Sequence, residues 1–210
     1  FNTTSGVISG TATATQNPAV VHTVTATNSG GSTTATVTVT VNAPAPTIAY
    51  TGSPYVYTKG TAITNLTPAT SNGASYSVSP ALPTGLSLSV LTGVISGTPS
   101  VISAATTYTV TITNSTGQTA TTTISITVND VAPSALAYST PSPTYILNTA
   151  ITNNTPTSSG GAVVSYSVNP ALPTGLSLNT GTGVISGTPT VTKNPSGVYT
   201  VTATNSGGST

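Results

Sequence analysis

The stretch that decides the fold is Thr107-Tyr-Thr-Val-Thr-Ile-Thr113, in which hydroxyl and apolar side chains alternate without a break. In an extended chain Tyr108, Val110 and Ile112 share one face, and the threonines share the other. This period of two predicts a β-strand with one buried face. Residues 118–128 alternate in the same way after a short turn that contains Asn and Gly, so the two runs together predict a β-hairpin.

Further short strands are expected upstream of this hairpin, separated by proline and glycine. They are residues 55–58, 61–66, 75–79, 86–88 and 94–96. No run has the 3.6-residue period of an amphipathic helix. About seven short strands in roughly 90 residues are typical of an antiparallel β-sandwich, so the chain is expected to be all-β.

The same blocks of sequence recur along the chain at domain-sized spacing. They are residues 76–88 with 166–178, residues 93–97 with 183–187 and 6–10, and residues 108–115 with 199–206 and 22–29. The offsets of 86 to 91 residues exceed the roughly 20–50 residues of solenoid repeats. The repeats therefore predict β-sandwich domains arranged end to end.

The position of each block within its repeat predicts three domains. Residues 1–43 are the C-terminal half of a repeat, residues 44–131 are a complete repeat, and residues 132–210 lack the last strand. We expect a window on a longer array, with strands supplied by a neighbouring molecule as the alternative. The linkers at 41–47 and 128–134 contain proline and no glycine, which favours a stiff connection.

The near absence of charge excludes several classes of function. The charged residues are Lys59, Lys193 and Asp130, and His22 is the one imidazole. Two lysines in different repeats cannot form the basic patch that nucleic-acid binding needs. Calcium sites need several carboxylates and zinc sites need Cys and His clusters, so no metal and no cofactor is expected. No stretch approaches the roughly 18 apolar residues of a membrane span.

Three segments in a fixed order carry a family resemblance. They are Ala81-Leu-Pro-Thr-Gly-Leu-Ser-Leu88, Thr92-Gly-Val-Ile-Ser-Gly-Thr-Pro99 and residues 108–114. They resemble the bacterial putative immunoglobulin-like domain family, which is close to the cadherin-like domains of dystroglycan type. The resemblance implies tandem immunoglobulin-like sandwiches in large secreted or surface-anchored bacterial proteins, commonly adhesins and stalks, and it implies no catalytic residues. Because the acidic clusters of calcium-binding cadherins are missing, calcium-dependent rigidity is not expected.

The few residues that could carry chemistry have simpler interpretations. His22 stands where the other repeats have Tyr108 and Tyr199, so we interpret it as a strand residue at a packing position. A catalytic triad would need a carboxylate to orient the His, and the single carboxylate, Asp130, lies in another repeat. We interpret Asp130 as a solvated linker residue. Lys59 could form an isopeptide cross-link only beside a buried acid, which the composition does not supply.

Two further groups of residues have the chemistry of binding or modification sites. Tyr50, Tyr55 and Tyr57 could form an aromatic platform for a sugar, but Tyr145 and Leu147 occupy the places of the last two. A site that accepts Tyr or Leu is more typical of a core, which is our interpretation. Sequons occur at Asn2, Asn65, Asn114 and Asn153, as expected by chance in a chain with 78 Ser and Thr residues.

The sequence thus predicts a non-enzymatic structural segment of an extracellular repeat protein, with no catalytic, cofactor-binding or metal-binding residues. The alternatives are a module that binds a glycan or a cell-surface protein and an accessory segment of a larger secreted enzyme. Since sheet edges without charges favour association, we expect the partners to be neighbouring repeats or other copies in a filament. Alternatively, O-linked sugars on the hydroxyl-rich faces would keep neighbouring chains apart.

Overall fold

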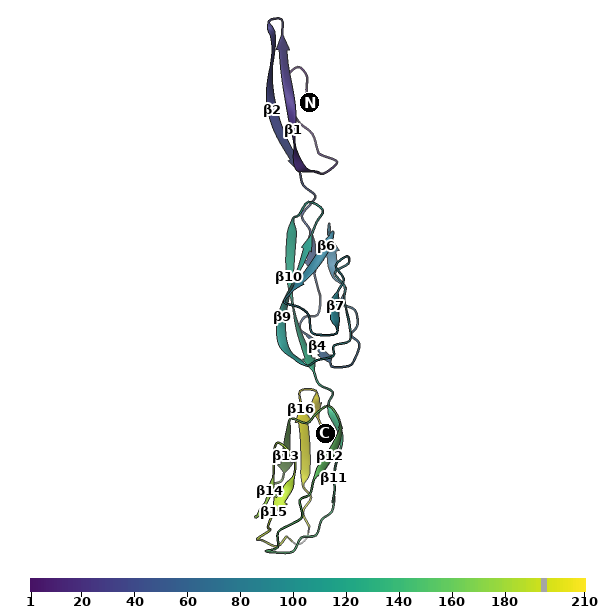
Figure 1. Ribbon diagram of the computed structural model, residues 1–210, viewed down its shortest axis with the longest axis vertical. Helices are drawn as coiled ribbons and strands as arrows, with labels where there is room; N and C mark the ends of the chain where they lie inside the picture. The colour runs from purple at the N-terminus through teal and green to yellow at the C-terminus, as the bar shows by residue number, and fades with distance from the viewer. Residues whose placement is uncertain (194–195) are drawn as a thin grey trace.

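The computed structural model describes residues 1–193 and 196–210. All regular secondary structure within these residues is β-strand, which confirms the all-β prediction. The strands gather in three bodies that follow one another along a single long axis (Figure 1). We call them the N-terminal hairpin (β1 and β2), the middle unit (β3 to β10) and the C-terminal unit (β11 to β17).

The N-terminal hairpin is a regular antiparallel pair. Strand β1 (Gln16–Asn28) pairs with β2 (Gly31–Val41) from Val20↔Val39 to Asn28↔Gly31, so a two-residue turn joins them. Alternating valines place an apolar face on this pair. That face is incompletely covered, because Val20 and Val37 keep 44% and 37% of their surface exposed.

The middle unit is a small sandwich of short and long strands. Its strands are β3 (Thr47–Ala49), β4 (Tyr55–Thr58), β5 (Ala69–Ser71), β6 (Ser75–Ser79), β7 (Leu86–Leu88), β8 (Ile95–Gly97), β9 (Ser103–Thr113) and β10 (Thr119–Asn129). The main sheet has the order β4-β10-β9-β6. Two antiparallel pairs, β3 with β5 and β7 with β8, supply residues to the same core.

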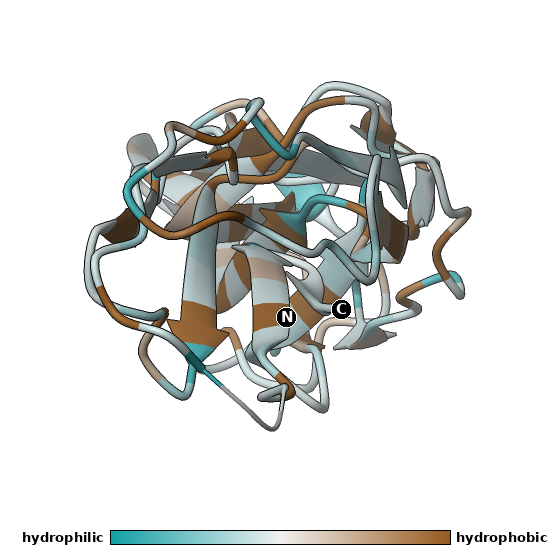
Figure 2. Ribbon diagram, turned by 90° about the horizontal axis from the view of Figure 1, so that it is seen from below, coloured by the Kyte–Doolittle hydropathy of each residue, from teal (hydrophilic) through white to brown (hydrophobic). Residues whose placement is uncertain are grey.

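The core of the middle unit consists of the apolar positions that alternate along β9 and β10. Val110, Ile124 and Ile126 are 0–1% exposed and pack against Leu86 and Ile95 from the β7–β8 pair. Full burial of such a side chain contributes about 1.5–3 kcal/mol. Seen along the long axis, apolar and polar bands alternate along the strands (Figure 2).

Three features of the middle unit differ from the sequence prediction. Residues 61–66 do not form a strand; they make one isolated bridge, Leu66↔Ile95, because this segment crosses over the core as a loop. Strands β3 and β5 were not predicted, since three residues are too few to show a period. Strand β4 pairs with β10 in the parallel sense, from Ile126↔Tyr55 to Asn129↔Thr58, within an otherwise antiparallel sheet.

In its described residues the C-terminal unit repeats the arrangement with fewer strands. They are β11 (Pro133–Tyr138), β12 (Pro156–Gly160), β13 (Ser165–Asn169), β14 (Leu176–Leu178), β15 (Ile185–Gly187), β16 (Thr200–Asn205) and β17 (Gly208–Ser209). Residues 145–147, which match β4, are not in a strand. In the middle unit β4 pairs with β10, and β17, which matches the start of β10, has two residues here.

Candidate functional site

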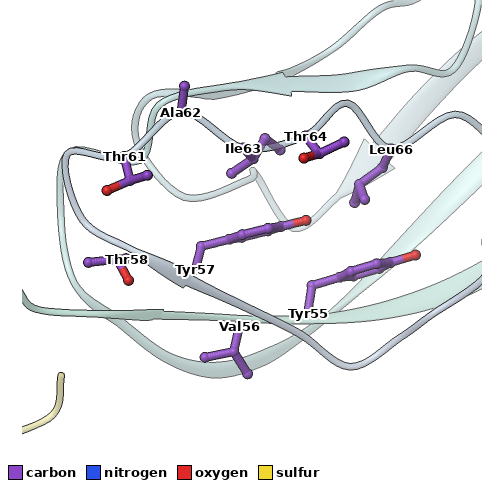
Figure 3. A pocket seen from close by; sticks show the side chains of 9 residues that line it. All are labelled: Tyr55, Val56, Tyr57, Thr58, Thr61, Ala62, Ile63, Thr64 and Leu66. Atoms are coloured by element: carbon purple, nitrogen blue, oxygen red, sulfur yellow. The ribbon is translucent and has the colours of Figure 1, made fainter. Parts of the chain in front are cut away.

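The most distinctive side-chain cluster outside the apolar core is a tyrosine pair on β4. Tyr55 and Tyr57 are two residues apart on a strand, so their side chains leave the same face. Their ring centroids are 6.2 Å apart and the ring planes differ by 4°. Figure 3 shows the two rings side by side, with Val56 pointing to the opposite side of the strand.

A cavity of about 420 Å³ lies between this pair and the loop that follows β4. Thr61, Ile63 and Leu66 from the loop line it together with the tyrosine rings (Figure 3). Both tyrosines are half-buried and pack against the core cluster, as do Ile63 and Leu66. The geometry therefore supports the interpretation of the pair as the outer layer of the core, with one edge open to solvent.

The hydroxyls of the pair are in different environments. Tyr55 Oη donates a hydrogen bond of 2.6 Å to the carbonyl of Thr51. Tyr57 Oη is enclosed and has no hydrogen-bond partner among the described residues. Burial raises the pKa of Tyr57 above its usual value, and the neighbouring Tyr55 hydroxyl raises it further.

Tyr50 is not part of an aromatic platform, because it has a structural role that both units repeat. Its hydroxyl donates to the carbonyl of Gly93, and Tyr138 makes the same bond to Gly183 at 2.6 Å. Burial raises the pKa of Tyr50 to about 12, with smaller contributions from the hydroxyls of Tyr76 and Tyr55. The sequence pattern did not reveal this bond, although Tyr50, Gly93, Tyr138 and Gly183 stand at matching places in the two repeats.

His22 does not occupy a packed position, so that interpretation is wrong. Its ring is exposed on the apolar face of the N-terminal hairpin, where Nε2 lies 3.2 Å from Nε2 of Gln16. Tyr108, at the matching place in the middle unit, is 3% exposed because the β7–β8 pair covers it. The hairpin face carries no equivalent cover, so the same position is open to solvent.

The charged residues are not gathered into a chemical site. Asp130 Oδ1 accepts a hydrogen bond of 2.9 Å from the next backbone N–H, that of Val131. The Lys59 backbone N–H donates to the carbonyl of Asn129 as a continuation of the β4–β10 pairing. Within residues 1–193 and 196–210, no group of three or more His, Cys, Asp or Glu side chains lies close enough to hold a metal ion.

The four sequons lie in unlike places. Asn2, Asn65 and Asn153 are exposed, and Asn2 Oδ1 caps a local turn by accepting from the N–H groups of Thr4 and Ser5. Asn114 is 4% exposed and its amide donates to protein oxygens, so it is not accessible to a modifying enzyme in the folded unit.

Comparison with protein families gives two matches. A family model described as "Putative Ig domain" matches residues 38–129 and again residues 132–210. No curated protein matches the chain. No helix in the described part of the chain has the length and apolar character needed to cross a membrane.

Solved structures with a similar arrangement are multidomain fragments of low sequence identity. The titin fragment I67–I69 is 13% identical, with 93% of this chain and 73% of that one covered and a TM-score of 0.47. Cadherin domains 1–5 of protocadherin gamma B2 are 14% identical, with 90% and 43% covered and a TM-score of 0.38. The eight N-terminal Ig domains of the Down syndrome cell adhesion molecule are 15% identical, with 92% and 30% covered and a TM-score of 0.41.

Proposed function

Because the chain belongs to the family described as "Putative Ig domain", we propose that it is a structural segment of an extracellular repeat protein. In this proposal it serves as a stalk or filament of a bacterial surface protein of the adhesin type. Tandem immunoglobulin-like domains are typical of extracellular and adhesion proteins, and families of this kind are generally non-catalytic. The segment therefore acts by its length and stiffness, with no catalytic activity of its own.

The observation that carries the proposal is the end-to-end arrangement of the bodies (Figure 1). The polypeptide leaves each body at one end and enters the next after a few residues, so every added unit lengthens the molecule. Strand β10 has 11 residues, which at about 3.3 Å each gives a unit roughly 35–40 Å long. We assign residues 1–43, 44–131 and 132–210 to successive repeats of this rod.

The composition supports a passive role in a second way. Hydroxyl side chains cover the outer face of the β9–β10 pair, where Thr109 lies opposite Thr123 and Thr111 lies opposite Thr121. Such a face is hydrated but offers no group that titrates near neutral pH. Stability then rests on apolar burial and the backbone hydrogen-bond ladder, which suits a spacer exposed to changing conditions.

Deletion of one unit from the surface-displayed protein tests this function. Removal of residues 44–131 is expected to bring whatever lies beyond the segment closer to the cell by about 35–40 Å, the length of one unit. An insertion of a second copy of residues 44–131 is the matched control and should move it outward by the same amount. Loss of ligand binding with no change in height would assign the segment to the alternative role.

The alternative is a binding module, favoured by the open edge of the tyrosine pair. If a glycan ring stacks on Tyr55 and Tyr57, the Tyr55→Ala variant should no longer bind the glycan. Tyr145→Ala in the C-terminal unit serves as the control. A screen of the purified chain against immobilised glycans measures this. Binding that disappears only in Tyr55→Ala would establish the alternative.

Self-association into a filament is part of the proposal. Two lysines and one aspartate leave a formal net charge of +1, so electrostatic repulsion between copies is weak. Sedimentation velocity of the purified chain measures it, and a monomer fraction that stays constant over a dilution series would contradict it.

A further inference from the structure

The segment that enters the C-terminal unit is held by the turn between β16 and β17. The Asn205 side-chain amide donates to the carbonyls of Val131, at 2.7 Å, and Ala162, at 3.2 Å. Its Oδ1 accepts from the Gly207 N–H at 2.7 Å, and Ser206 Oγ accepts from the Asp130 N–H at 2.9 Å. Asn205 is only 8% exposed, so its own bonds are largely shielded from water, whereas Ser206 is exposed.

The segment that enters the middle unit is held by the corresponding turn between β9 and β10. The Asn114 amide donates to the carbonyl of Pro44 at 2.9 Å, and Thr116 Oγ1 accepts from the Ala43 N–H at 3.2 Å. Ala43 and Pro44 match Asp130 and Val131 in the repeat. Both junctions thus use an asparagine amide and a turn hydroxyl on two successive linker residues.

Close backbone packing accompanies these bonds at the second junction. A Cβ added to Gly207 would lie 2.1 Å from the Asp130 carbonyl oxygen, and one added to Gly161 would lie 2.2 Å from the Val131 carbonyl oxygen. Any side chain at these places would push the linker away. The linker is therefore enclosed by the turn on one side and by the end of β12 on the other.

At the first junction the contact extends to the preceding body. Asn17 lies on β1 of the N-terminal hairpin, and its amide donates to the Thr116 carbonyl at 3.3 Å and to Asn42 Oδ1 at 3.1 Å. The turn of the middle unit therefore touches both the linker and the hairpin before it. A turn in this place restricts the angle between the two bodies.

We propose that the β-hairpin turn of each unit is the docking site for the linker that enters the unit, and that this asparagine clamp fixes the angle at each junction. The clamp consists of Asn114 and Thr116 at the first junction and of Asn205 and Ser206 at the second. It gives the array stiffness without a metal ion, because side-chain hydrogen bonds to proline-containing segments without glycine leave few backbone conformations. Asn114 and Asn205 are positioning residues in this proposal, which rests on the structural role proposed above.

Distance measurements between spin labels test the clamp at the second junction. The chain has no cysteine, so Thr121→Cys and Ser177→Cys, both exposed, place one label on each side of the junction. The otherwise unchanged chain is expected to give a narrow distance distribution. Asn205→Ala should broaden it about twofold, as the linker changes from a fixed to a flexible segment.

Asn28→Ala is the matched control, because Asn28 stands at the same place in the hairpin repeat and accepts from the Gly30 N–H. Its loss weakens a turn at the far end of the molecule and should leave the distribution narrow. Ser206→Ala removes only the hydroxyl that accepts from the Asp130 N–H. This variant tests the clamp if Asn205→Ala unfolds the C-terminal unit. Circular dichroism of each variant reports whether the units stay folded.

An unchanged distribution in folded Asn205→Ala and Ser206→Ala would overturn the clamp, and so would equal broadening in Asn28→Ala. Broadening confined to the two junction variants supports it. This result is independent of the display experiment, because junction stiffness is measured on the purified chain. A stiff junction with no change in surface height on deletion of residues 44–131 would leave the clamp in place and reject the stalk.

Discussion

At the scale of single residues, stability is concentrated in the isoleucines and valines of the middle unit. Ile95 has no exposed surface, and it touches both the long hairpin and the loop through its bridge to Leu66. Val56 lies on the other face of β4 with 63% of its surface exposed. Alanine substitutions at the two positions therefore compare the loss of a buried side chain with the loss of an exposed one.

We expect Ile95→Ala to lower the free energy of unfolding of the middle unit by about 2–5 kcal/mol, because the cavity adds to the lost transfer energy. Val56→Ala should change it by less than about 0.5 kcal/mol, as usual for surface positions. Hydrogen exchange of the β9 amides measures the opening of this unit within the whole chain. Similar losses in both variants would show that Ile95 is not in a tightly packed core.

The raised pKa of Tyr50 predicts a loss of stability at alkaline pH. The unfolded state loses its proton near pH 10.0, whereas the folded state holds the proton until about pH 12. Between these values the unfolded state binds fewer protons, so stability falls as pH rises, and it is fully present below the lower value. Half-buried Tyr57 and Tyr138, whose pKa values are also raised, act in the same direction.

Chemical denaturation at a series of pH values measures this effect. Tyr50→Phe should cost about 1 kcal/mol at neutral pH through the lost bond to Gly93. The same variant should fall less steeply than the wild type between about pH 10 and pH 12. Identical slopes for the two proteins in this range would contradict the assignment.

The burial of many single residues could be predicted from the alternation of apolar and hydroxyl side chains alone. Tyr108, Val110 and Ile112 were assigned to the buried face, and each is 0–3% exposed. The bond from Tyr50 to Gly93 could not be predicted, since it joins residues 43 apart through a side chain that no period marks. His22 was misplaced because its burial depends on covering strands and not on its own strand.

At the scale of elements, the β7–β8 pair depends on glycines that permit close approach. Gly97 has φ +126°, and a Cβ there would lie 2.1 Å from the Gly85 carbonyl oxygen. Gly187 repeats this at the same distance from Gly175 in the C-terminal unit. Gly60 has φ +79°, but nothing lies within 4 Å of a Cβ added there. A substitution of Gly60 therefore measures the cost of the left-handed backbone conformation without a steric clash.

We expect Gly97→Ala to destabilise the middle unit by about 3 kcal/mol or more, since backbone must move to admit the methyl group. Gly60→Ala should cost about 1–2 kcal/mol, the penalty of a left-handed conformation without a clash. Urea denaturation followed by far-ultraviolet circular dichroism compares the two. A smaller loss for Gly97→Ala than for Gly60→Ala would mean that the close contact is absent in solution.

The long strands were predictable at this scale, and the short ones were only partly so. The hairpin of β9 and β10 alternates over enough residues to fix its boundaries within a few positions. Residues 61–66 were expected to form a strand, but Ile63 and Leu66 pack against the core from a loop. The parallel pairing of β4 with β10 depends on a chain path that local sequence does not encode.

At the scale of the whole molecule, the repeats predicted the tandem arrangement but not the junctions. Sequence offsets placed matching blocks at domain-sized intervals, and proline-containing linkers suggested stiff connections. The hydrogen bonds from Asn114 and Asn205 were not foreseen, because both asparagines resemble ordinary turn residues. The boundaries at residues 43/44 and 131/132 stay a prediction, as does the absence of catalytic, cofactor-binding and metal-binding residues.

The scarcity of charge predicts that the stability of the whole chain is almost independent of salt. Surface ion pairs lose strength once salt shortens the screening length to about 10 Å at 0.1 M, but this chain has almost none to lose. We expect the same urea midpoint from about 0.02 M to about 0.3 M sodium chloride. Calcium chloride or a chelator should leave that midpoint unchanged as well.

A variant with added charge gives this prediction a positive control. Thr109 and Thr123 lie directly opposite on β9 and β10, so Thr109→Lys with Thr123→Lys places like charges side by side on an exposed face. That variant should lose up to about 1 kcal/mol at low salt and recover part of it as salt is added. A wild-type midpoint that moves as much as that of the variant would require electrostatic interactions that two lysines and one aspartate cannot provide. The source of stability would then have to lie outside the apolar cores and the strand pairing.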